Sequence, residues 1–92
     1  MKKRKVHIIV SGRVQGVGFR YSTHNKAKEL NINGWVKNTF DGKVEAMLEG
    51  DENNIREMLS WCSKGPSMAF VSNIEILEQP YIEEYKEFTI KR

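Results

Sequence analysis

A glycine-rich segment between an alternating stretch and a helix-like stretch constrains the fold of this chain most strongly. The nine residues Gly12-Arg13-Val14-Gln15-Gly16-Val17-Gly18-Phe19-Arg20 contain three glycines within seven positions. Glycine adopts φ > 0 without steric cost, so the backbone can curl here where other residues would clash. A curled loop that leads into a helix points several N–H groups at one place, which then attracts an anion. The segment therefore predicts a phosphate-binding loop between a strand and a helix.

The arginine that ends this segment strengthens the prediction. Arg20 supplies a planar guanidinium whose donors suit phosphate oxygens. A helix dipole disfavours a cation at the helix N-terminus, so its position there is better explained if an anion lies beside it. Without this arginine the three glycines would be weaker evidence for a phosphate-binding loop, because glycines between two elements are most often turn residues.

The first half of the chain reads as strand, helix and hairpin. Val6, Ile8 and Val10 alternate with less apolar positions, which predicts a strand over residues 6–11 with one apolar face. A helix is expected over residues 20–30, ended by a left-handed cap at Asn31. Two strands, over residues 32–39 and 43–49, flank Phe40-Asp41-Gly42, a hairpin signal.

The second half contains the clearest helix. Asp51 is a good N-cap, Gly65-Pro66 provides a stop, and apolar residues recur at helical spacing at Ile55, Met58, Leu59 and Cys62. Strands over residues 70–76 and 88–90 follow. The order β-α-β-β-α-β plus a short terminal strand predicts an α/β (α+β) sandwich of the ferredoxin-like, split βαβ type. Its mostly antiparallel sheet carries two helices on one face.

Length and composition indicate one domain over residues 1–92 without a membrane partner. The lone Cys62 excludes an internal disulfide and fits a reducing compartment, and no apolar run is as long as a membrane span. We therefore expect a cytoplasmic protein. Residues 1–37 carry nine Lys and Arg against one acid, whereas residues 38–92 carry six against eleven, so the half with the glycine loop attracts anions. The alternative is that Lys2-Lys3-Arg4-Lys5 forms a solvated tail and inflates this asymmetry.

A second segment, Gly34-Trp35-Val36-Lys37-Asn38, lies on the strand after the first helix, with Gly42, Val44 and Gly50 following. Together with residues 12–20 it resembles the two signature segments of the acylphosphatases, and the similarity continues through residues 51–66 and 85–90. The resemblance implies a ferredoxin-like enzyme that hydrolyses the carboxyl–phosphate bond of acyl phosphates. It also implies that Arg20 binds the phosphate, that Asn38 positions the attacking water, and that loop N–H groups hold the phosphoryl oxygens. Those N–H groups would belong to Gln15, Gly16, Val17, Gly18, Phe19 and Arg20.

The residues suit this chemistry. An acyl phosphate has a stabilised carboxylate as its leaving group, so no strong general acid is needed. The enzyme must neutralise the phosphoryl oxygens and hold water in line, which Arg20 with the loop amides and Asn38 can do. Asparagine is too weak a base to take the proton, which we expect to pass to the substrate's own phosphate. We therefore expect no cofactor, no metal and no covalent phosphoenzyme, with inorganic phosphate as product and inhibitor of a monomer.

Other interpretations are weaker. Gly18-Phe19-Arg20-Tyr21 is faintly like the aromatic signature of RNA-binding ferredoxin-like domains, but here it opens a helix instead of lying on a strand, so we expect no nucleic-acid partner. A P-loop is excluded because no Gly-Lys-Ser/Thr follows the glycines, and the glycine spacing does not match a Rossmann motif. An acylphosphatase-like module that binds without turnover remains open, although a chain that stands alone favours a free enzyme. Isolated side chains are expected to be exposed (His7, His24) or to serve packing (Trp35, Trp61, Cys62).

Overall fold

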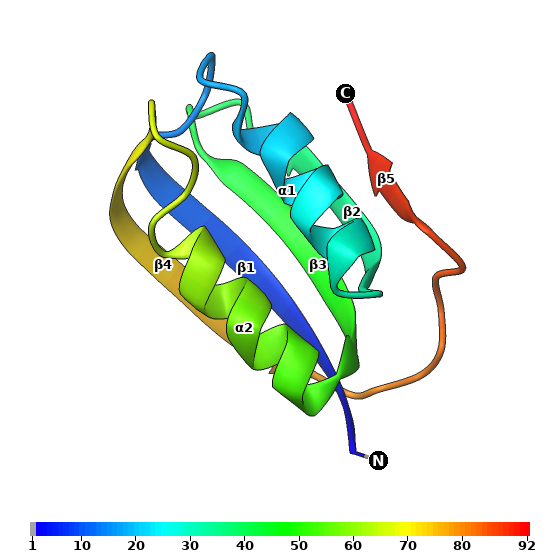
Figure 1. Cartoon of the computed structure of the whole chain (residues 1–92). Helices are drawn as coiled ribbons and strands as arrows, with labels where there is room; N and C mark the ends of the chain where they lie inside the picture. Colours follow the sequence, from blue (N-terminus) through cyan, green and yellow to red (C-terminus); the bar gives the residue numbers. More distant parts are fainter. Residues whose placement is uncertain (1) are drawn as a thin grey trace.

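Seven elements follow one another in a computed structural model that describes residues 2–92 (Figure 1). The strands are β1 (Lys3–Arg13), β2 (Asn33–Asn38), β3 (Val44–Asp51), β4 (Phe70–Gln79) and β5 (Phe88–Ile90), and the helices are α1 (Phe19–Glu29) and α2 (Glu52–Cys62). The predicted order of elements is confirmed. The strands β1 and β4 are longer than their apolar patterns indicate, because they pair with each other and β1 also pairs with β3 through polar positions.

The five strands form one sheet in the order β4-β1-β3-β2-β5. All neighbours are antiparallel except β2 and β5, which run parallel. Figure 1 shows α1 and α2 lying side by side over the same face of this sheet. The predicted ferredoxin-like α+β sandwich, with a mostly antiparallel sheet, is therefore confirmed. Two local predictions are also confirmed. Asn31, after α1, is left-handed with φ 55°, and the chain turns between β2 and β3 at Gly42, whose φ is 90°.

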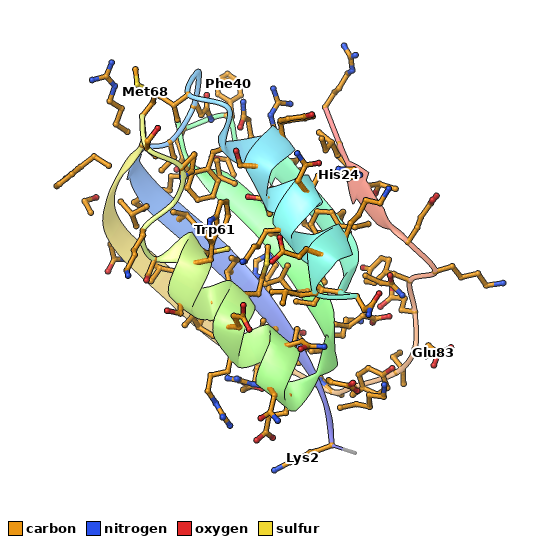
Figure 2. All side chains as sticks on the ribbon, in the orientation of Figure 1. Lys2, His24, Phe40, Trp61, Met68 and Glu83 are labelled. Atoms are coloured by element: carbon orange, nitrogen blue, oxygen red, sulfur yellow. The ribbon has the colours of Figure 1, made fainter. Side chains whose placement is uncertain are left out.

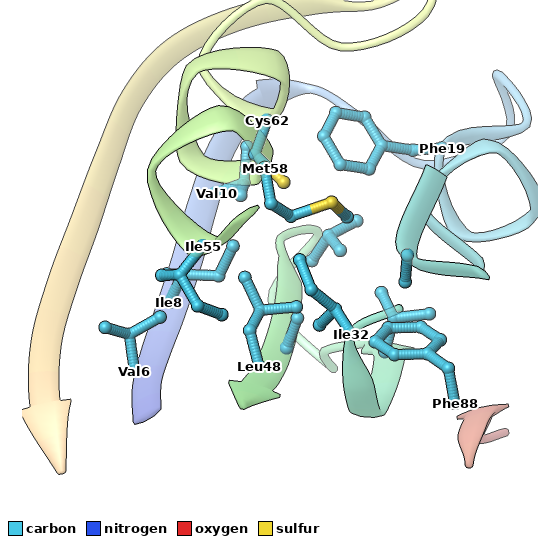
Figure 3. Packing of buried hydrophobic residues seen from close by; sticks show 14 of the residues in the cluster. Val6, Ile8, Val10, Phe19, Ile32, Leu48, Ile55, Met58, Cys62 and Phe88 are labelled. Atoms are coloured by element: carbon cyan, nitrogen blue, oxygen red, sulfur yellow. The ribbon is translucent and has the colours of Figure 1, made fainter. Parts of the chain in front are cut away.

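The hydrophobic core fills the space between the helices and the covered face of the sheet (Figure 3). Alternate residues of β1 and β3 point into it, and α2 contributes Ile55, Met58 and Cys62, each fully buried. Phe19, at the start of α1, is 2% exposed and packs against Trp61 with ring centroids 5.7 Å apart. Burial raises the pKa of the Cys62 thiol to about 12. Cys62 and Trp61 are therefore packing residues, as their positions in the sequence predict.

The other face of the sheet is partly covered by the segment between β4 and β5. Trp35 is 8% exposed and its indole N–H donates to the Tyr85 hydroxyl at 3.1 Å. His7 lies on this face with its side chain only 17% exposed and Nε2 2.6 Å from a Glu45 carboxylate oxygen. The prediction that His7 is exposed was wrong, because a strand pattern gives the face of a residue but not what neighbouring strands place beside it.

The basic N-terminal segment is not a solvated tail. Residues from Lys3 onward belong to β1, and the four basic side chains all pair with carboxylates. Asp51 does begin α2 as its N-cap residue, but its carboxylate contacts Lys3 Nζ at 2.7 Å and makes no side-chain capping bond. In Figure 2, Lys2 lies at one end of the molecule and Phe40, in the β2–β3 hairpin, lies at the other.

Candidate active site

The loop that joins β1 to α1 has the conformation that its glycines predict. Gly16 and Gly18 have φ of 74° and 77°, in the left-handed region that residues with a Cβ adopt at a cost. A Cβ built on either glycine would meet no atom within 4 Å. These positions therefore require glycine for the path of the backbone, and the space above them is open to a ligand.

Backbone N–H groups of the loop are free to bind that ligand. Within residues 2–92, the amides of residues 15–18 donate to no other protein group. Gly18 is the N-cap of α1, and the bond from Ser22 N to Gly18 O, 3.0 Å long, belongs to the first turn of the helix. The N–H groups of Phe19 and Arg20 precede that bond and have no acceptor within the helix. The loop and the helix start thus present unpaired donors, where the helix dipole also favours an anion.

Arg20 lies in the first turn of α1, which contains no acidic residue. One terminal nitrogen of its guanidinium donates to the backbone carbonyl of Lys91 at 3.4 Å. Among residues 2–92 no carboxylate lies within 4.0 Å of the guanidinium, which is only partly exposed. The protein thus holds this cation beside a helix N-terminus without a neutralising partner.

Asn38 comes from a different part of the fold. It is the last residue of β2, pairs with Val44 of β3, and is partly exposed. The side-chain amide of Gln15 donates to the carbonyls of Thr39 and Lys43, both at 2.8 Å. These two bonds attach the glycine loop to the hairpin that follows Asn38.

The loop, α1, β2 and the end of β5 enclose a cleft of about 360 Å³. Figure 1 shows the β1–α1 loop, the β2–β3 hairpin and the C-terminal end of β5 at the same end of the molecule. Arg20 and Asn38 both line this cleft, so the fold brings together the two side chains singled out in the sequence. Its lining contains two arginines and no acidic side chain: Val14, Gly16, Gly18, Phe19, Arg20, Tyr21, Asn38, Ile90 and Arg92.

Comparison with known proteins identifies the family. The family model described as acylphosphatase matches residues 6–90. The chain belongs to the acylphosphatase family. An acylphosphatase of Methylococcus capsulatus is 43% identical over 89 residues, which cover 97% of each chain.

Solved acylphosphatase structures agree with this assignment. The crystal structure of the Bacillus subtilis acylphosphatase has a TM-score of 0.93 at 38% identity, covering 97% of this chain and 99% of that one. The Coxiella burnetii acylphosphatase has a TM-score of 0.91 at 40% identity, covering 97% and 93%. The resemblance inferred from the two sequence segments is confirmed, and with it the predicted identity as an acylphosphatase.

Not every residue predicted for this acylphosphatase's phosphate loop lies at the cleft surface. Gly16, Gly18, Phe19 and Arg20 line the cleft, whereas the side chain of Val17 packs against the core and that of Gln15 turns to the hairpin. The sequence predicts only a backbone role for Gln15 and does not reveal its side-chain hydrogen bonds to the hairpin. No pattern in the sequence carries that contact, because its acceptors are carbonyls 24 and 28 residues away.

The remaining candidates lie outside the cleft. His24 does not line it, and the prediction that His24 is exposed was wrong: the residue is partly buried, with its ring 6.1 Å from the ring of Phe88. In the stretch that resembles an RNA-binding signature, Phe19 is buried in the core and Tyr21 is exposed, but both lie on helix α1 and not on a strand of the sheet. Within residues 2–92, no three His, Cys, Asp or Glu side chains are grouped as metal ligands. Neither helix in that range has the length and apolar character needed to cross a membrane.

Proposed function

We propose that this protein hydrolyses acyl phosphates in the cleft, with Arg20 and Asn38 as its catalytic residues. Membership of the acylphosphatase family supports the reaction. The observation that carries the assignment of roles is the convergence of an unpaired guanidinium, free loop amides and Asn38 on one cleft from three separate elements. Backbone amides of residues 15–20 and Arg20 bind the phosphoryl oxygens.

In this mechanism the protein positions the reactants and stabilises charge. Fixed N–H donors and the Arg20 fork neutralise the phosphoryl oxygens as charge redistributes in the transition state. The Asn38 amide accepts a hydrogen bond from a water molecule and orients its oxygen toward phosphorus, in line with the leaving oxygen. The new P–O bond forms as the bond to the acyl oxygen breaks. A carboxylate leaves, and the proton of the water passes to a phosphate oxygen.

The same geometry supports the other properties that we propose. The cleft is complete within one chain, which fits a monomer, and its binding determinants match the inorganic phosphate that the reaction releases, so phosphate inhibits competitively. The lone thiol of Cys62, buried and hard to ionise, fits a cytoplasmic location. Catalysis requires no metal and forms no phosphoenzyme.

Hydrolysis of benzoyl phosphate in EDTA tests this proposal. Asn38→Ala should lower kcat by about a hundredfold, because a misplaced water loses in-line attack, while the inhibition constant of phosphate stays within about twofold. Asn73→Ala, on the exposed part of β4, is the matched control and should retain full turnover.

Two results would contradict the proposal. Equal losses of turnover and of phosphate inhibition in Asn38→Ala would assign Asn38 to the anion site instead of the water. A folded wild-type protein that binds phosphate but turns over no acyl phosphate would be a binding domain.

A further inference from the structure

The cleft extends beyond the phosphate loop. At about 360 Å³ it lies within the range of small-molecule sites, roughly 300–1,000 Å³, and exceeds the need of a single phosphate. Its lining also includes Tyr21 of α1, Ile90 of β5 and Arg92, none of which belongs to the proposed catalytic set. Tyr21 is 67% exposed and Ile90 is 40% exposed, so both offer apolar surface to the acyl part of a substrate.

The alternation of β5 accounts for the position of Arg92. Phe88 is buried in the core and Ile90, two residues on, lines the cleft. Pairing continues beyond β5, because Lys91 N donates to the Val36 carbonyl at 2.8 Å. The side chain of Lys91 lies on the other face of the sheet, with Nζ 4.6 Å from the centre of the Trp35 ring. Arg92 therefore returns to the face of Ile90 and reaches the cleft.

Arg92 is a cation without a carboxylate partner. Across residues 2–92 it forms no ion pair within 4.0 Å, and no acidic side chain lines the cleft. In the proposed function Arg20 and the loop amides bind the phosphoryl group, which leaves the guanidinium of Arg92 available for a second anion. Since a guanidinium fork binds carboxylates and phosphates in two-point fashion, a second anion in the substrate is its natural ligand.

We infer that Arg92 is a specificity residue, which favours acyl phosphates whose acyl part carries a second anionic group. This rests on the proposed function, since the phosphoryl end must be held by the loop and Arg20. The acyl part then lies against Tyr21 and Ile90, with its far anion facing Arg92. Neutral acyl phosphates remain substrates, but they gain nothing from this contact.

The test compares rigid substrates of equal shape and different charge. We would measure kcat/KM for 4-carboxybenzoyl phosphate and for its neutral isostere 4-carbamoylbenzoyl phosphate, and repeat both with the 3-substituted isomers to cover the reach of Arg92. Wild type should prefer the carboxylate by about fivefold for at least one isomer at low salt, and the preference should shrink as salt screens the contact. Arg92→Gln should abolish the preference, and Arg92→Glu should reverse it.

Lys91→Gln is the matched control, because it removes one positive charge at the adjacent position but on the opposite face of the sheet. It should leave the ratio of the two kcat/KM values unchanged. Equal losses for charged and neutral substrates in Arg92→Gln would assign Arg92 to the phosphoryl group and overturn the inference. Wild-type turnover without any charge preference would overturn the inference alone. Failure of wild type to hydrolyse any of these compounds would overturn the proposed function as well.

Discussion

The two ends of the molecule use the same kind of residue in opposite ways. At the end where β1 begins, each cation has a carboxylate partner: Lys2 pairs with Glu52 at 3.5 Å, Lys3 with Asp51 at 2.7 Å, Arg4 with Glu78 at 2.5 Å and Lys5 with Glu49 at 4.0 Å. At the cleft end, within the described residues, Arg20 and Arg92 have none. The positive charge of the N-terminal half therefore does not attract anions evenly, because carboxylates neutralise the basic residues at the start of β1.

This contrast separates stability from function. Most pairs at the β1 end are partly exposed and each contributes at most about 1 kcal/mol, but Lys5 and Glu49 are buried, with side chains 6% and 3% exposed. Unpaired cations beside a helix N-terminus cost stability at the cleft end. Inorganic phosphate should offset that cost, since a ligand that binds only the folded state raises the free energy of unfolding.

The largest effect should come from replacing the unpaired arginine by lysine. Arg20→Lys keeps the charge but removes the planar fork, so we expect kcat/KM for benzoyl phosphate to fall about a thousandfold, or roughly 4 kcal/mol. Arg4→Lys makes the same exchange at the opposite end, where Glu78 is the partner, and should leave kcat/KM unchanged. Activity of Arg20→Lys within a few-fold of wild type would show that only a point charge is needed at the cleft.

A smaller effect, on stability instead of turnover, is expected from the buried pair. Glu49 accepts hydrogen bonds from the amides of Glu84 at 3.1 Å and Tyr85 at 2.9 Å, and so fixes the segment that crosses from β4 to β5. Glu49→Ala leaves these amides without their acceptor and removes one of the two carboxylates near buried Lys5, which keeps its ion pair with Glu84. It should lower the free energy of unfolding by about 3 kcal/mol in urea, with kcat retained in the folded protein.

The control for this prediction is Glu57→Ala. The side chain of Glu57 is 59% exposed and 3.8 Å from Lys26, so its removal should change stability by less than about 1 kcal/mol. Equal losses in the free energy of unfolding for the two variants would show that the buried pair contributes no more to stability than the exposed pair.

How much of this was predictable from the sequence depends on how local each signal is. The element order, the glycine loop, the left-handed Asn31 and the helix of Ile55 and Met58 follow from local patterns, and the structure confirms them. Two long segments of the sequence point to Arg20 and Asn38, and both residues line one cleft in the structure. Contacts between distant segments were not predictable.

The pairing of Lys5 with Glu49 belongs to this second group, because it depends on the register of β1 with β3, where the two residues are direct partners. The partial burial of His7 and the position of Arg92 in the cleft were likewise not predictable from the sequence. Sequence periodicity gives the face of each strand residue, whereas register and the path of a connecting segment decide its neighbours. Charged residues in strands were therefore the least predictable part of the molecule.

The smallest of these effects should come from the contact that joins the two catalytic segments. Gln15→Ala removes both hydrogen bonds from the glycine loop to the hairpin after Asn38, so the water and the phosphate lose their fixed relation. We expect kcat to fall about tenfold, or roughly 1.4 kcal/mol, with the inhibition constant of phosphate within twofold of wild type. Gln79→Ala, at the end of β4 where Gln79 pairs with Lys5 of β1, is the matched control and should have no effect on kcat. A parallel loss of phosphate affinity in Gln15→Ala would mean that Gln15 acts only by shaping the phosphate-binding loop. Unchanged kinetics would mean that the loop and the hairpin keep their relative positions without these two hydrogen bonds.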